Sequence, residues 1–144
     1  MEFSFAPDDD RPDEIRNYIF FDNSETKWEK VYAYWWGGKP FNIVTRDVYF
    51  NEWPGFEMEK IEGTDIWRIE APLGVTGIIF NTGVTDQEVR DGKEAYQTSD
   101  LKYSTDNTGM MYKIDVSKKP EPGTGKDDAT KFKYSEGEWT EYKP

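Results

Sequence analysis

The stretch Val31–Trp36, with the sequence VYAYWW, decides how the rest of the chain is interpreted. Side chains of a β-strand point alternately to opposite faces, so these residues divide into two sets of three. One face carries Val31, Ala33 and Trp35, and the other carries Tyr32, Tyr34 and Trp36. The first face, with a small alanine between two larger residues, suits a packed core. The second face is a row of flat rings, and large amphipathic rings are typical of wet binding surfaces.

The row of rings has two interpretations. It can be buried beneath a second sheet or a loop, as most strands rich in aromatic residues are. It can instead form a binding surface, and the composition favours this second interpretation. Hydrophobic residues make up only 35% of the chain, yet aromatic residues reach 17%, with 6 Trp, 9 Tyr and 9 Phe. That is more aromatic side chains than the minimal core of a domain this size needs.

Length and charge limit the function classes. The 144 residues are enough for one domain with a real core, and no apolar run approaches the length of a membrane span. The net charge of -11 argues against binding to nucleic acid or to an anionic membrane, because both rely on Lys and Arg. This charge neither favours nor disfavours the binding of a neutral partner such as a sugar.

Two residue types are missing from the sequence altogether. The chain has neither Cys nor His, which removes disulfides, thiol nucleophiles, the usual zinc ligands and the Ser-His-Asp triad. We therefore expect no metal and no cofactor. The many carboxylates carry no signal, because glycosidase chemistry needs two acids at a set separation that a sequence cannot show. No phosphate-binding loop, dinucleotide fingerprint or nucleophile elbow is present. The residue types and motifs of the sequence therefore argue against a catalytic function.

Alternation and turn residues predict an all-β domain. Residues 1–13 are acidic and proline-marked and are interpreted as a flexible tail or linker, and residues 14–144 as a single domain. Short strands separated by turns, with no convincing helical period, favour an antiparallel sandwich or barrel. The predicted strands are Glu14–Phe21, Lys30–Trp36, Phe56–Ile61, Ile66–Ala71, Gly77–Asn81, Tyr96–Thr98, Met110–Val116, Thr130–Tyr134 and Glu138–Tyr142, with a possible short strand at Asp47–Phe50. We expect Phe56–Ile61 and Ile66–Ala71 to form one hairpin, and the last two strands another.

The chemistry that the sequence favours is stacking on sugars. A sugar ring has an apolar face that an aromatic side chain can cover, and a rim of hydroxyl groups that bonds to amides, hydroxyls and carboxylates. Tyr32, Tyr34 and Trp53 supply the rings, and the amides of Asn81 and Gln97 are candidates for the rim. Trp53 begins a Trp-Pro-Gly turn, which should aim its ring rigidly.

Several fragments in order resemble the starch-binding modules of carbohydrate-binding module family 26. They are Trp28–Trp36, Trp53–Met58, Ile78–Asn81, Gln97–Leu101 and Glu136–Trp139, and the similarity runs from about Tyr18 to Tyr142. The resemblance implies an immunoglobulin-like antiparallel β-sandwich that binds α-1,4-glucan without cleaving it. It implies that Tyr32, Tyr34 and Trp53 form the stacking surface and that Gln97 contacts hydroxyl groups. The connection between Trp36 and Trp53 is longer than in the family, so Trp36 is the alternative ring.

We therefore expect a non-catalytic module that binds starch and malto-oligosaccharides. It would be a monomeric part of a larger extracellular or cell-surface bacterial protein, such as an amylase or a starch-adherence protein. Two alternatives stay open at this point: an adhesion or scaffold sandwich whose aromatic face binds another protein, and a small glycan-active enzyme that uses paired carboxylates.

Overall fold

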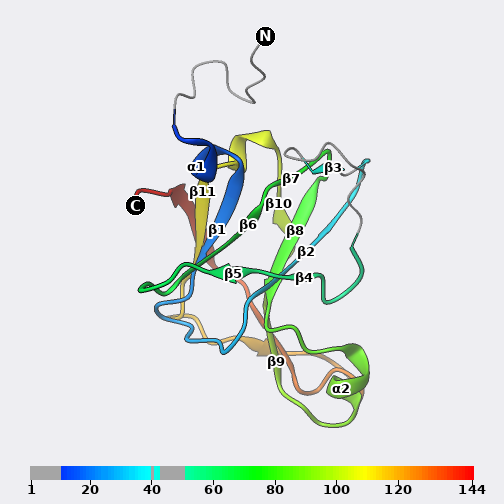
Figure 1. The fold of residues 1–144 in the computed structure, drawn as a ribbon. Coiled ribbons are helices and arrows are strands. Elements are labelled where there is room, and N and C mark those ends of the chain that lie inside the picture. Colours follow the sequence, from blue (N-terminus) through cyan, green and yellow to red (C-terminus); the bar gives the residue numbers. More distant parts are fainter. Residues whose placement is uncertain (1–10, 40, 43–50) are drawn as a thin grey trace.

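The computed structural model describes residues 11–39, 41–42 and 51–144 of the chain, which form two β-sheets packed face to face (Figure 1). The first sheet has five strands in the order β14 (Gly137–Glu141), β11 (Met110–Ile114), β1 (Tyr18–Asp22), β6 (Ile66–Glu70) and β5 (Glu59–Lys60). The second has the order β12 (Glu121–Pro122), β13 (Lys131–Tyr134), β9 (Ala95–Thr98), β8 (Gly77–Asn81), β2 (Tyr32–Trp36) and β4 (Phe56–Glu57), and β10 (Leu101–Lys102) also pairs with β8. A small third sheet pairs β3 (Phe41–Asn42) with β7 (Pro72–Leu73). The helices are α1 (Asp13–Arg16), α2 (Asp86–Arg90) and a 3-10 turn, η1 (Thr105–Asn107).

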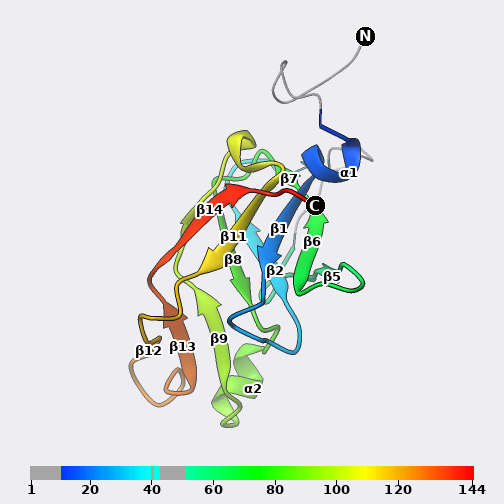
Figure 2. The ribbon, with the colours of Figure 1, turned by 90° about the vertical axis from the view of Figure 1, so that its left-hand side faces the viewer.

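The predicted all-β sandwich is confirmed, and both large sheets are mixed. Most neighbouring strands are antiparallel, but β1 pairs with β11 in parallel and β13 pairs with β9 in parallel. Figure 2 shows β14, β11, β1 and β6 side by side in one layer, with β8 and β2 behind them. Residues 1–10 of the predicted tail and the possible strand at Asp47–Phe50 lie outside the described residues.

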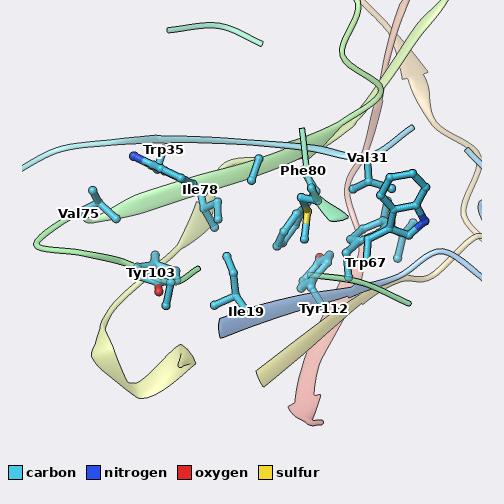
Figure 3. Packing of buried hydrophobic residues seen from close by; sticks show 14 of the residues in the cluster. Ile19, Val31, Trp35, Trp67, Val75, Ile78, Phe80, Tyr103 and Tyr112 are labelled. Atoms are coloured by element: carbon cyan, nitrogen blue, oxygen red, sulfur yellow. The ribbon is translucent and has the colours of Figure 1, made fainter. Parts of the chain in front are cut away.

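The core lies between the two sheets and is rich in aromatic rings. Figure 3 shows side chains of β2 and β8 pointing toward side chains of β1 and β11. Trp35 is 3% exposed, and Phe80 and Ile19 are fully enclosed. The Phe80 ring stands 6.0 Å from the ring of Tyr112, across the gap between the sheets. Burial of such large side chains is the main favourable term in folding.

The predicted hairpin at the C-terminus is wrong. Both strands exist, but β13 pairs with β9 and β12 in the second sheet, whereas β14 pairs with β11 in the first. The two strands pack their aromatic side chains against different sheets. Phe132 stacks on Tyr96 with centroids 5.2 Å apart, and Trp139 packs edge-on against Tyr112 at 5.3 Å. The chain between the two strands therefore crosses from one sheet to the other.

The predicted strand Phe56–Ile61 is also split between the sheets. Its first part, β4, pairs with β2, and its second part, β5, pairs with β6 as expected. Met58 lies between them, is 3% exposed, and donates its backbone N–H to the Val31 carbonyl at 2.8 Å. A buried side chain at the crossing point anchors the chain as it passes between the layers.

Two short helices replace residues that we expected to be extended or irregular. Glu14 lies in α1, so the first strand begins at Tyr18 rather than at Glu14. The connection between β8 and β9, where no regular element was expected, contains α2, whose start has a capping box: the side chains of Thr85 and Glu88 each accept a hydrogen bond from the other's backbone N–H. This Thr-x-x-Glu signature is readable in a sequence, whereas a helix of five residues is too short to show a period.

The alternation of β2 predicts opposite effects for two adjacent tryptophans. We expect Trp35→Ala to lower the free energy of unfolding by about 3–5 kcal/mol, because it removes a core side chain and leaves a cavity. Trp36→Ala should cost about 1 kcal/mol, because this ring is partly exposed on the other face. Urea denaturation of the two variants measures both values, and equal costs would contradict the assignment of the faces.

Candidate functional site

The outer face of β2 carries a row of partly exposed rings. Val31, Ala33 and Trp35 belong to the core. Tyr32, Tyr34 and Trp36 alternate with them in sequence, are partly exposed and lie on the opposite face. Among residues 11–39, 41–42 and 51–144, no second sheet covers the face interpreted as a possible binding surface. Its rings remain accessible from outside the sandwich.

Glycines support two of these rings from below. A Cβ atom at Gly83 would lie 2.4 Å from the ring of Tyr32, and one at Gly77 would lie 2.2 Å from the indole of Trp36. Neither position has room for a side chain, because the rings rest directly on the backbone. Both rings are consequently held against the sheet, which reduces the conformational entropy that they can lose when a ligand stacks on them.

Trp53 completes the surface from a separate segment of the chain. Its ring lies 5.3 Å from that of Tyr34 at an interplanar angle of 73°, while Tyr34 and Trp36 are 5.8 Å apart and tilted by 30°. We call these four residues, Tyr32, Tyr34, Trp36 and Trp53, the aromatic platform. Because the planes differ in direction, the platform is bent rather than flat.

Three contacts fix the turn that carries Trp53. The Asn51 amide donates to the Ala33 carbonyl at 3.0 Å and accepts from the Trp35 N–H at 3.4 Å. The Asn81 amide donates to the Pro54 carbonyl at 2.9 Å. Gly55 has a φ of +100° and approaches so closely that a Cβ there would lie 2.1 Å from the Ala33 oxygen. The Trp-Pro-Gly turn is thus tied to β2 and β8.

Asn81 has a structural role that the sequence did not reveal. We predicted that its amide would contact a ligand, but the side chain is 2% exposed and both of its polar atoms bond to backbone. Besides the bond to Pro54, its Oδ1 accepts the Gly83 N–H at 2.8 Å. Asn81 therefore holds the turn that carries Trp53, and it holds the backbone of Gly83, on which the Tyr32 ring rests.

Gln97 lies opposite Asn81 in the sheet and is 5% exposed. Its Nε2 donates to the Thr98 carbonyl at 3.3 Å, while its Oε1 is buried without a hydrogen-bond partner among the described residues. The Nε1 of Trp53 is a second such atom, and Trp67 Nε1 and the Tyr103 hydroxyl, both in the core, are two more. Buried polar atoms without partners are uncommon in folded proteins. Gln97 and Trp53 belong to the predicted site.

Lys131 is a residue of this region that the sequence did not single out. Its Nζ lies 4.6 Å from the centroid of the Trp53 ring and 3.7 Å from a carboxylate oxygen of Asp86. A cation over an indole face is attracted by the ring quadrupole. Lys131 also lines a hollow of about 410 Å³ together with Gln97, Lys133 and Ser135. Nothing in a Lys-Phe-Lys strand distinguishes such a lysine from an ordinary surface charge.

The described part of the chain contains no cluster of three or more acidic side chains that could hold a metal ion. Within residues 11–39, 41–42 and 51–144, no helix has the length and apolar character needed to cross a membrane.

Comparisons with known proteins give no family assignment. No protein-family model matches the chain, and no curated protein matches it.

The role of Asn81 can be tested by its removal. Asn81→Ala removes the partly buried hydrogen bonds to the Gly83 N–H and the Pro54 carbonyl. We expect the free energy of unfolding to fall by about 1–3 kcal/mol, because each bond contributes about 0.5–1.5 kcal/mol. Thermal or urea unfolding measures this change. If the variant loses less than about 0.5 kcal/mol, as a surface substitution does, the amide does not hold the turn.

Proposed function

We propose that the chain is a non-catalytic module that binds α-1,4-glucan, as in starch and malto-oligosaccharides, on the aromatic platform. The observation that carries the proposal is the bent set of partly exposed rings, in which Trp53 stands at 73° to Tyr34. Flat rings cover the apolar face of a sugar, and rings in different planes suit a chain that curves from one sugar to the next.

The two unpartnered atoms beside the platform support a hydroxyl-rich ligand. A sugar hydroxyl both donates and accepts, so it can bond to Gln97 Oε1 or to Trp53 Nε1. Both atoms are buried, so a hydroxyl reaches them only when the side chains that cover them move locally, while the turn that carries Trp53 stays tied to β2 and β8. A sugar that stacks on the Trp53 ring would take the place of the Lys131 ammonium, and binding would exchange a cation–π contact for stacking and hydrogen bonds to the sugar.

The charge of the molecule agrees with a neutral ligand. A net charge of -11 neither attracts nor repels an uncharged glucan, whereas it repels phosphate polymers. The ordered fragments that resemble carbohydrate-binding module family 26 point to the same ligand. We propose on these grounds an extracellular or cell-surface bacterial setting, as part of an amylase or a starch-adherence protein.

The bent platform predicts that the protein distinguishes starch from cellulose, although both are polymers of glucose. Retention on granular starch should greatly exceed retention on microcrystalline cellulose, because a flat crystalline surface can meet only one of the differently oriented rings at a time. A pull-down of the purified protein with both solids, at equal accessible mass, measures the difference. Equal retention on the two solids would refute the selectivity.

The central ring of the platform should carry much of the affinity. Tyr34→Ala is expected to weaken maltotriose binding by about 5–150-fold, by analogy with bases stacked on aromatic side chains. The matched control is Tyr142→Ala, because Tyr142 is also partly exposed but stacks on Phe20 of the first sheet. Calorimetric titration compares the two variants. Normal binding by Tyr34→Ala, or an equal loss in the control, would contradict the location of the site.

A further inference from the structure

A second concave region begins at the first residue of the platform. It is an open groove of about 770 Å³ at the end of the sandwich where α2 lies. Its walls come from the connection between β1 and β2, from residues 82–84 after β8, from α2, and from β9 and β13. We call it the end groove. Its volume is within the range of pockets that hold small molecules.

The aromatic side chains of the end groove come from four segments. They are Trp28, Tyr32, Tyr96 and Tyr134. The rings of Tyr96 and Tyr134 are 6.4 Å apart and tilted by 35°, so they form a second set of rings that is not flat. Both are partly exposed, although each also packs against the core. The groove thus contains a second pair of tilted rings in addition to Tyr32, which it shares with the aromatic platform.

The charges of the end groove balance, unlike those of the whole chain. Its lining contains three lysines and three glutamates, namely Lys27, Lys30, Lys93, Glu29, Glu88 and Glu94. A chain of net charge -11 would be expected to line an average groove with an acidic excess. A balanced set selects neither a cationic nor an anionic ligand, but it offers many donors and acceptors to a neutral one.

Three of these charged groups, Glu94, Lys93 and Glu88, are already fixed in position by hydrogen bonds or an ion pair. The Tyr96 hydroxyl donates to Glu94 at 2.8 Å, and this hydrogen bond raises the pKa of the tyrosine. Lys93 pairs with Glu88 at 3.3 Å, and Glu88 in turn caps α2 through Thr85. Hydrogen bonds from the Thr85 backbone and from Lys93 lower the pKa of Glu88. The Glu88 carboxylate therefore stays ionised near neutral pH, and the Glu94 carboxylate already accepts a hydrogen bond from a hydroxyl group, that of Tyr96.

Tyr32 connects the two regions. It belongs to the platform through the outer face of β2, and its ring, which rests on Gly83, also lines the end groove. We propose that the binding path for α-1,4-glucan continues from the platform past Tyr32 into the end groove, so that the module binds one chain several sugars long. This inference rests on the proposed function of the platform and adds the length of chain that the module recognises.

The first test compares malto-oligosaccharides of two lengths on the unmodified protein. A seven-unit chain offers five positions for a three-unit site, so maltoheptaose gains about fivefold over maltotriose by statistics alone. We expect a gain of at least about twentyfold, with one chain bound per protein, because rings of the end groove add stacking contacts. Calorimetric titration measures both the affinity and the stoichiometry.

The outcomes separate the extension from the function. Binding of maltotriose with only the statistical gain for maltoheptaose would refute the extension and leave the platform as the site. Two maltotriose molecules bound per protein, without a larger gain for maltoheptaose, would mean independent sites and would also refute one continuous path. If neither sugar binds, the proposed function itself fails, and the extension fails with it.

The second test removes groups of the end groove alone. Tyr96→Ala should leave maltotriose affinity unchanged and reduce the gain for maltoheptaose to about fivefold. Because Tyr96 also stacks on Phe132, thermal melts must show that this variant is folded. Glu94→Gln is the exposed second variant and should weaken maltoheptaose more than maltotriose. Glu141→Gln, at an exposed carboxylate on β14, is the control and should change neither. Equal effects on both sugars would overturn the extension.

Discussion

The alternation of side chains along β2 is the constraint on which the rest of the structure depends. Trp35 and Ala33 must enter the core for the two sheets to pack, and the period of two then forces Tyr34 and Trp36 outward. A shift of the strand by one residue would bury the platform and expose the core. The stability of the sandwich and the position of the site are therefore set by the same register.

The site also depends on polar groups that the core does not supply. Trp53 comes from a turn far from β2 in sequence, and the Asn51 and Asn81 amides tie that turn to the sheet. Asn81 contributes twice, because it also bonds the backbone of Gly83, on which the ring of Tyr32 rests. A hydrogen-bonded frame thus sets the angle between rings on different segments. This prepositioning limits the entropy lost when a ligand is bound.

Sequence reasoning predicted what local patterns determine. Alternation identified most strands and both faces of β2, and the excess of rings pointed to the platform residues. The pairing of strands was not predictable in the same way. β13 and β14 join different sheets, where Phe132 packs on Tyr96 and Trp139 packs on Tyr112. The roles of Asn81 and Lys131 depend on contacts between distant segments, so neither residue type reveals them. The α2 capping box was visible as Thr85 and Glu88, although the helix is too short for a period.

The most direct test of glucan binding on the outer face of β2 follows the indole N–H signals of the 6 tryptophans by NMR during titration with maltotriose. We expect shifts for Trp36 and Trp53, which belong to the platform, with the larger change at Trp53 as its buried Nε1 finds a partner. The signals of Trp35 and Trp67, which lie in the core, should stay in place. Shifts confined to core tryptophans, or no shift at saturating sugar, would contradict the claim that the outer face of β2 binds glucan.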